Sequence, residues 1–258
     1  QLIREFGARV VLMTPSYMLA LADEFERQGI DPRETAMRVG IFGAEPWTEG
    51  MRAEIEQRTG IDAVDIYGLS EVIGPGVACE YLESKDGPTI WEDHFYPEIV
   101  DPETGAPLSD GEPGELVFTS LTKEAMPVIR YRTRDLTRLL AGSMTVMRRM
   151  AKITGRSDDM LIVRGVNLFP SQVEEQILRD PLLTGHYVIE LTRNGPLDDL
   201  LVRVEARSLL GDDAAGRSAD ELVRRLKGMC GLSAAVEIVA PGGIERSMGK
   251  ARRVIDRR

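Results

Sequence analysis

The sequence IDAVDIYGLSE occupies residues 61–71 and guides the interpretation of the whole chain. Its apolar first half predicts a short buried strand, and Gly68 marks the turn that ends it. In a nucleotide site, Tyr67 would offer a flat face to a base, Ser70 a hydroxyl to a phosphate oxygen, and Glu71 a hard oxygen ligand to Mg²⁺. A strand that runs into a capped turn is the simpler interpretation of the same residues, because short motifs produce many false matches.

Composition sets the outer limits on fold and function. The chain has 258 residues, of which 43% are hydrophobic and 29% charged, which is enough for one large domain or two unequal ones. Its net charge of −10 argues against nucleic acid or an anionic membrane as the main partner. No apolar run approaches about 18 residues and no signal-peptide pattern is present, so we expect a cytoplasmic protein without a membrane span.

The cysteines and histidines do not predict a metal centre or a disulfide framework. Cys79 and Cys230 are far apart and form no CxxC pair, and the only histidines are His94 and His186. Cys79 and His94 supply two ligands without a third, which does not make a zinc site.

Strands and helices alternate in the first seventy residues. A capping threonine followed by proline marks the start of the first helix, and a glycine closes the second. This alternation predicts an α/β layer with a mainly parallel sheet. The expected strands are 9–13, 39–42 and 61–66, and the expected helices are 14–28 and 47–59.

The middle third has a different pattern. Residues 73–76 contain two glycines and a proline and predict a loop. Beyond it, short strands separated by Gly- and Pro-rich turns predict an antiparallel or barrel-like sheet within the same large domain. The expected strands are 95–100, 114–121, 128–131 and 136–140.

A third pattern begins near Asp158 and predicts a small α+β domain. We therefore expect two domains, 1–157 and 158–258. Capping boxes that start at Ser171 and Ser218 predict the beginnings of two helices, and 211–217 has the composition of a loose linker. The expected strands are 160–163, 186–192, 200–206 and 235–239, and the expected helices are 171–179 and 219–229.

Two further segments fit a nucleotide site. The segment Gly43-Ala44-Glu45-Pro46 lies at a strand end, where open α/β sheets bind ligands, although it also fits an ordinary strand-to-helix turn. Asp135 ends a strand and could accept both hydroxyls of a ribose. Surface ion pairs with Arg132 and Arg134 explain Asp135 equally well.

Two charged residues in the last hundred are also candidates. Arg156 lies in Gly155-Arg156-Ser157-Asp158-Asp159, at the expected domain boundary, and could reach a ribose or phosphate; a polar interdomain turn is the alternative. Lys250 is the one ammonium of a Gly- and Ser-containing loop, and a lysine in such a loop is most often solvated surface.

Taken in order, these motifs resemble a known family. Tyr67-Gly68-Leu69-Ser70-Glu71, Tyr131-Arg132-Thr133-Arg134-Asp135, the segment around Arg156, and Arg246-Ser247-Met248-Gly249-Lys250 follow the order seen in the adenylate-forming superfamily of acyl-CoA synthetases and adenylation domains. Residues 91–98, 121–125 and 166–172 are similar to its phenylacetate–CoA ligase branch. The resemblance covers nearly the whole chain.

The resemblance implies a two-step reaction with ATP, Mg²⁺ and coenzyme A. A carboxylate attacks the α-phosphate of ATP, and the thiol of coenzyme A then displaces AMP from the acyl-adenylate. Carried over by position, the resemblance implies that Tyr67 and the 43–46 loop contact adenine, that Ser70 contacts phosphate and that Glu71 binds Mg²⁺. It implies that Asp135, assisted by Arg156, binds the ribose hydroxyls. Asp158 would be the hinge, Gly165 would lie on the pantetheine path, and Lys250 would supply the ammonium of the first step.

The substrate and the acceptor stay open. A flat aromatic acid such as phenylacetate is the family expectation, and the residues that could line its pocket are Phe42, Ala44, Ile66, Ile73 and Gly74. Three functions stay open. The protein could be a ligase that transfers the acyl group to coenzyme A, an adenylation enzyme that transfers it to a carrier-protein thiol, or a nucleotide-binding module without turnover.

One departure from the family concerns the phosphates. The Gly/Ser/Thr-rich loop that cradles the ATP phosphates in the family has no counterpart here. We therefore expect a missing N-terminal segment, or a partner that covers the truncated sheet, and we also consider a homodimer.

Overall fold

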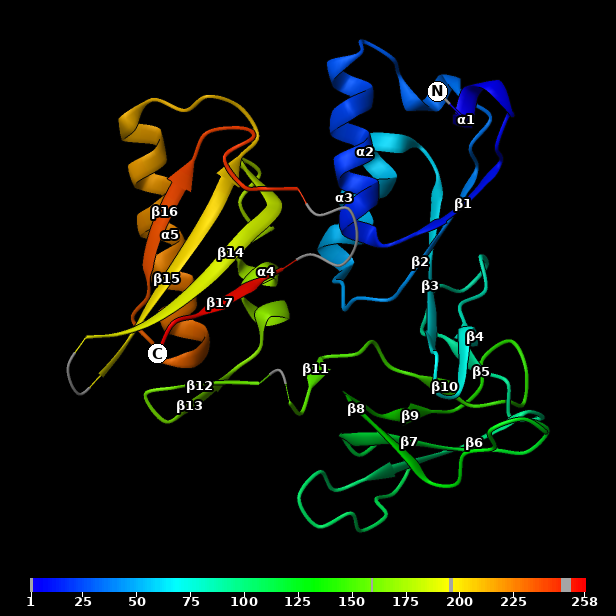
Figure 1. The fold of residues 1–258 in the computed structure, drawn as a ribbon. Coiled ribbons are helices and arrows are strands. Elements are labelled where there is room, and N and C mark those ends of the chain that lie inside the picture. Colours follow the sequence, from blue (N-terminus) through cyan, green and yellow to red (C-terminus); the bar gives the residue numbers. More distant parts are fainter. Residues whose placement is uncertain (1, 159, 195–196, 247–251) are drawn as a thin grey trace. The chain divides into compact units, whose positions relative to one another are not determined.

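The computed structural model describes residues 2–158, 160–194, 197–246 and 252–258. The chain forms two compact units, which are Gln1–Trp47 with Arg52–Asp159 and Thr48–Met51 with Met160–Arg258 (Figure 1).

The first unit opens with parallel strands and helices. Thr14 caps the first long helix, because its hydroxyl accepts a hydrogen bond from the Tyr17 N–H at 3.4 Å. Val10 and Leu12, on one face of β1, are exposed, whereas Val11 on the other face is buried. The elements are α1 (Leu2–Glu5), β1 (Val10–Met13), α2 (Pro15–Arg27), η1 (Pro32–Glu34), β2 (Val39–Phe42), α3 (Glu49–Thr59, of which Arg52–Thr59 belong to this unit) and β3 (Asp62–Leu69), and β1, β2 and β3 are parallel neighbours in that order.

The sheet continues through an antiparallel hairpin. β4 (Ile73–Cys79) pairs with β3 and with β5 (Thr89–Ile90), so the loop predicted for 73–76 is wrong. Ile73 at one end of β4 and Ala78 and Cys79 at the other pair with β3, so the segment lies in the sheet although its two glycines and Pro75 predict a loop. β9 (Leu139–Leu140) and β10 (Arg149–Met150) complete a seven-stranded sheet in the order β1-β2-β3-β4-β5-β10-β9.

A second, antiparallel sheet completes the first unit. Its order is β11-β8-β7-β6, and the four strands do not close into a barrel. Buried apolar side chains, among them Leu116 and Phe118, join it to the seven-stranded sheet in one core. The α/β prediction for this fold is therefore confirmed. The strands are β6 (Phe95–Val100), β7 (Gly114–Ser120), β8 (Tyr131–Thr137) and β11 (Gly155–Arg156).

The second unit has a four-stranded sheet with two helices against it. Tyr187, Ile189, Val202 and Val204 alternate along the two central strands and form its core with side chains of α4 and α5. The sheet order is β16-β15-β14-β17, beside a separate β12–β13 hairpin. The elements are β12 (Leu161–Val163), β13 (Val166–Leu168), α4 (Pro170–Ile177), β14 (Leu183–Asn194), β15 (Leu197–Ala206), α5 (Asp212–Cys230), β16 (Ala235–Val239) and β17 (Val254–Asp256).

Helix α5 begins earlier than its sequence predicts. Residues 211–217, predicted as a linker, form its N-cap and first turns, with Asp212 and Asp213 at the positive end of the helix dipole. Ser218 lies inside the helix and donates to Asp180 at 2.7 Å, so the capping box predicted there is wrong. Although α5 has 19 residues, no helix in the described ranges is long and apolar enough to cross a bilayer.

Candidate nucleotide-binding site

Two glycines allow the motif loops of the first unit to pack closely. A Cβ on Gly43 would lie 2.2 Å from the carbonyl oxygen of Ile66, because Gly43 follows β2 and packs directly against β3. A Cβ on Gly68 would lie 2.7 Å from the backbone nitrogen of Gly76. Backbone atoms cannot move aside as side chains do, so both positions require glycine.

Tyr67 connects the two sheets of the first unit. Its hydroxyl donates a hydrogen bond to Oδ2 of Asp135 on β8 at 2.6 Å. Burial raises the pKa of Tyr67 well above its usual value, and the Asp135 carboxylate raises it further. The tyrosine hydroxyl therefore stays protonated and continues to donate to Asp135.

Arg156 lies on the other side of Asp135. Strand β11 pairs antiparallel with β8 so that Arg156 and Asp135 are register partners. The Arg156 Nη1 atom is 3.5 Å from Oδ1 of Asp135. Its Nε and Nη2 atoms donate to the two carboxylate oxygens of Asp158 at 2.8 and 2.9 Å.

These contacts form what we call the outer polar cluster, which consists of Tyr67, Asp135, Arg156 and Asp158. The hydrogen bonds from Arg156 lower the pKa of Asp158, so that carboxyl stays ionised. Tyr67, 68 residues before Asp135, and Arg156, 21 residues after it, thus meet at the same carboxylate. A carboxylate with a donor on each side is suited to accept vicinal hydroxyls.

The Ser70–Glu71 turn follows β3 and is exposed. Lys123, which the sequence did not single out, donates from Nζ to the backbone carbonyl of Glu71 at 2.9 Å. Burial and then the Glu71 carboxylate raise the pKa of Tyr131.

Among the described residues, no three His, Cys, Asp or Glu side chains lie together as a metal-binding group. Mg²⁺ is commonly held by one or two carboxylates plus substrate phosphates, and an exposed Glu71 beside Ser70 fits that arrangement.

The 43–46 loop follows β2 at the same end of the sheet as the Tyr67 turn. Ala44 has a positive φ of 68°, an uncommon conformation for a residue other than glycine. The Glu45 carboxylate accepts the Ser16 N–H in the first turn of α2 at 2.8 Å. This bond ties the loop to the N-terminus of α2.

The apolar residues predicted for an acyl pocket differ in exposure. Phe42 is fully buried and packs edge-on against Trp47 with ring centroids 5.6 Å apart. Ile66 is half-buried, and Ala44, Ile73 and Gly74 are exposed.

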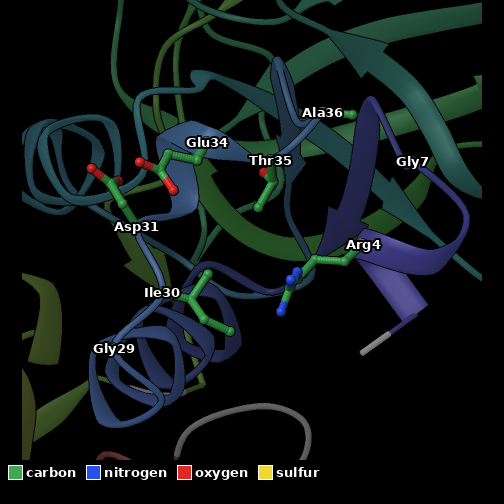
Figure 2. A pocket seen from close by; sticks show the side chains of 8 residues that line it. All are labelled: Arg4, Gly7, Gly29, Ile30, Asp31, Glu34, Thr35 and Ala36. Carbon is green, nitrogen blue, oxygen red and sulfur yellow. The ribbon is translucent and has the colours of Figure 1, made fainter.

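A hollow of about 330 Å³ lies away from these motifs (Figure 2). Its lining comes from residues just before β1 and β2, whereas the motif loops follow β2 and β3. Since the strands are parallel, the hollow and the motif loops lie at opposite ends of the sheet. The lining residues are Arg4, Gly7, Gly29, Ile30, Asp31, Glu34, Thr35 and Ala36.

Two predicted site residues belong to the C-terminal part of the chain. Gly165 lies in the two-residue turn between β12 and β13, where Arg164 and Gly165 have φ values of 51° and 80°. Two successive positive φ values favour glycine at such a turn. Lys250 falls outside the described residues.

A second group of polar side chains was missed by the sequence reasoning. The Lys152 ammonium lies 4.1 Å from the centroid of the Trp47 ring, and the Arg52 guanidinium lies 5.0 Å from it. We call this group the inner polar cluster. No local motif marks it, because its members come from separate segments of the first unit. They are Trp47, Arg52, Asp65, Glu80 and Lys152.

Comparison with known families agrees with this arrangement. The profile described as AMP-binding enzyme matches residues 1–122, and the profile described as AMP-binding enzyme C-terminal domain matches residues 165–258. The chain belongs to the AMP-binding enzyme family. This confirms the family resemblance predicted from the ordered motifs.

Relatives of the AMP-binding enzyme family extend the comparison. The chain is 60% identical over 266 residues to a phenylacetate–coenzyme A ligase of Aromatoleum evansii, which covers 100% of the chain and 60% of that protein. It therefore spans about 60% of the length of the curated relatives that it matches.

Solved structures of a 2-hydroxyisobutyryl-CoA ligase are also similar. In a postadenylation state with 2-HIB-AMP, that ligase matches with a TM-score of 0.92 at 30% identity over 98% of this chain and 55% of its own. In a thioesterification state with 2-HIB-AMP and CoA, it matches with a TM-score of 0.59 over the same shares at 30% identity.

Proposed function

We propose that this chain carries part of an AMP-forming acid–thiol ligase, which activates an aromatic carboxylic acid with ATP and transfers the acyl group to coenzyme A. The convergence of Tyr67, Asp135 and Arg156 from three distant segments carries the proposal. A phenylacetate-like acid is the proposed substrate, in keeping with the name of the relative at 60% identity.

In the proposed nucleotide site, Asp135 accepts the two ribose hydroxyls. Arg156 lies within 3.5 Å of the same carboxylate and neutralises part of its charge. Tyr67 stays protonated, holds Asp135 by its hydroxyl and offers its ring to the adenine beside the 43–46 loop. Ser70 contacts phosphate, and Glu71 with phosphate oxygens would hold Mg²⁺, which neutralises phosphate charge when bound.

The proposed chemistry has two half-reactions. A carboxylate oxygen forms a bond to the α-phosphorus of ATP, and pyrophosphate leaves with the electrons of the broken P–O bond. The thiol of coenzyme A then gives up its proton, its sulfur bonds to the acyl carbon, and AMP leaves with the electrons of the broken C–O bond. Lys250 reduces the repulsion between carboxylate and phosphate in the first step.

We also propose the domain assignment predicted from sequence. Residues 1–157 form the C-terminal portion of the large AMP-binding domain, and residues 158–258 form a small mobile domain with its hinge at Asp158. Gly165 lies on the pantetheine path of coenzyme A. The exposed face of β1 is where a missing N-terminal segment or another covering partner would pack, and a homodimer stays a prediction.

Acid-dependent ATP–pyrophosphate exchange tests the proposal. We expect the full-length protein that contains these residues to catalyse exchange with aromatic acids in preference to aliphatic ones. An acceptor assay with coenzyme A against carrier protein separates the ligase from a carrier-loading enzyme. Nucleotide binding without exchange for any acid would contradict the proposal and favour a non-catalytic nucleotide-binding module.

Lys250→Ala tests the division into half-reactions. Loss of one positioned donor to a developing charge typically lowers the rate by about 10²–10³. We expect acyl-adenylate formation to fall by that amount, while pre-formed acyl-adenylate still yields thioester. Equal loss in both half-reactions would contradict the proposed role of Lys250.

A further inference from the structure

The inner polar cluster places a shielded ammonium against an aromatic ring inside the first unit. The Lys152 Nζ atom is inaccessible to solvent and lies 4.1 Å from the centroid of Trp47. Trp47 is itself only 4% exposed. Burying an ammonium is costly, and the face of an indole together with a nearby carboxylate offsets that cost. That carboxylate is Asp65. Burial raises the pKa of Asp65, and the positive charge of Lys152 lowers it by a smaller amount.

The rest of the cluster is held rigidly. Arg52 and Glu80 form a two-point ion pair at 2.8 and 2.9 Å. Glu80 also accepts the backbone N–H groups of Asp65 at 2.8 Å and Gly87 at 3.1 Å. Glu80, and Arg52 through it, are therefore tied to the backbone of β3 at Asp65.

Three members of the cluster lie within four residues, in sequence, of residues in the proposed nucleotide site. Trp47 immediately follows the 43–46 loop. Asp65 lies two residues before Tyr67 on β3, and Lys152 lies four residues before Arg156. Lys152 thus belongs to the third segment, contacts Trp47 beside the first, and attracts the Asp65 carboxylate on the second through its charge.

We propose that Lys152 is a positioning residue that sets nucleotide affinity, because its contact with the Trp47 ring and its attraction to the Asp65 carboxylate hold together the three segments that carry the 43–46 loop, Tyr67 and Arg156. It acts through these residues and does not itself touch the nucleotide. The proposal rests on the proposed function only in requiring that a nucleotide binds at these three segments.

The groups that face Asp65 make the arrangement sensitive to charge. They are the ammonium of Lys152, the guanidinium of Arg52, the carboxylate of Glu80 and the indole of Trp47. Burial and the two acidic side chains also raise the pKa of the adjacent Cys79 thiol to about 11, so Cys79 stays protonated and adds no charge.

AMP binding by calorimetry on the full-length protein tests the proposal with three variants. Lys152→Met removes the charge and keeps the chain length, and we expect AMP to bind at least tenfold more weakly. Lys152→Arg keeps a cation over Trp47, and we expect it to recover most of the affinity. The matched control is Lys85→Met, which removes a lysine paired with Glu56 and Asp62 at 2.7 and 2.8 Å in the same unit. We expect that control to bind AMP within twofold of the parent.

A kinetic comparison separates positioning from a general loss of stability. Well below the melting temperature of each variant, we expect Lys152→Met to raise the KM for ATP at least tenfold and to change kcat for pyrophosphate exchange less than threefold. Unchanged AMP affinity and unchanged KM in Lys152→Met would overturn the proposal, and so would a loss that Lys85→Met reproduces.

The outcomes also separate this proposal from the proposed function. A parent protein that binds AMP but exchanges no pyrophosphate contradicts only the ligase function, and Lys152 is then judged by AMP affinity. A parent protein that binds no AMP overturns both proposals.

Discussion

Two arginine–carboxylate pairs in the first unit have nearly the same geometry and opposite surroundings. Arg52 with Glu80, in the inner polar cluster, and Arg156 with Asp158, in the outer polar cluster, are both joined at 2.8 and 2.9 Å. The side chains of the inner pair are 6% and 1% exposed, whereas those of the outer pair are 37% and 53% exposed.

This difference in exposure indicates that the Arg52–Glu80 pair is structural, whereas the Arg156–Asp158 pair can respond to a ligand. Glu80 also accepts two backbone N–H groups, so its oxygens are occupied and shielded. Asp158 faces solvent, which screens its attraction to Arg156. A ligand can therefore rearrange the outer pair at little cost, whereas breaking the inner pair leaves a buried charge without its partner.

Removal of the inner arginine should have the largest effect. We expect Arg52→Ala to lower the free energy of unfolding by about 3–5 kcal/mol, because it leaves the Glu80 carboxylate buried and uncompensated. Urea denaturation followed by circular dichroism measures the change. The control is Arg27→Ala, which removes an exposed pair with Glu24 and should leave the free energy of unfolding nearly unchanged, because solvent screens that pair. Similar losses in both variants would remove the distinction between buried and exposed pairs.

Asp65 should give the next largest effect, and one that depends on pH. Burial raises its pKa from 3.8 to about 6. The folded state then binds a proton more tightly than the unfolded state, so this contribution to stability is present below pH 3.8 and is lost as pH rises through 6. A shift of this size corresponds to at most about 3 kcal/mol.

Asp65→Asn removes that titration. We expect the free energy of unfolding of the parent, relative to the variant, to fall between pH 4 and pH 7 by about 1–3 kcal/mol. Urea denaturation at several pH values checks this. A difference that stays constant with pH would show that Asp65 titrates normally.

Tyr67→Phe tests the outer polar cluster. It removes the 2.6 Å hydrogen bond to Asp135 and leaves Arg156 beside that carboxylate. We expect a loss of about 1–2 kcal/mol in the free energy of unfolding, since the group is half-buried and hydrogen bonds to charged groups are worth about 1.5–3 kcal/mol when lost. Thermal and urea denaturation both report it. A loss as large as that of Arg52→Ala would place Tyr67 energetically with the inner polar cluster.

Asp158→Asn should have the smallest effect on stability. The pair with Arg156 is exposed, so we expect a change below about 1 kcal/mol that shrinks further in high salt. The contribution of Asp158 to the free energy of unfolding changes with pH in the direction opposite to that of Asp65. Arg156 lowers the pKa of Asp158, so its contribution is present above the ordinary value of 3.8 and is lost as pH falls through the lowered pKa. A salt-independent loss, measured by denaturation at low and high ionic strength, would contradict this.

Local patterns predicted much of the fold and failed at identifiable places. The strand 95–100 and the cap at Thr14 follow from residues next to one another, and the structure has β6 at Phe95–Val100 and a capped α2. Residues 73–76 have loop composition but form part of β4, because β3 lies alongside as a partner. Residues 211–217 have linker composition but form the start of α5, where two aspartates favour the N-terminal turn.

The sequence by itself determined the α/β class, the order of motifs and the identity of the family. It named Tyr67, Asp135 and Arg156 separately, but only the tertiary structure decided that a tyrosine hydroxyl and a guanidinium meet the same carboxylate. Only the tertiary structure placed Lys152 against Trp47. The physical reason is that helix caps and strand periodicity depend on neighbours in the chain, whereas these contacts depend on strand order, register and burial, which are set by the packing of the whole unit.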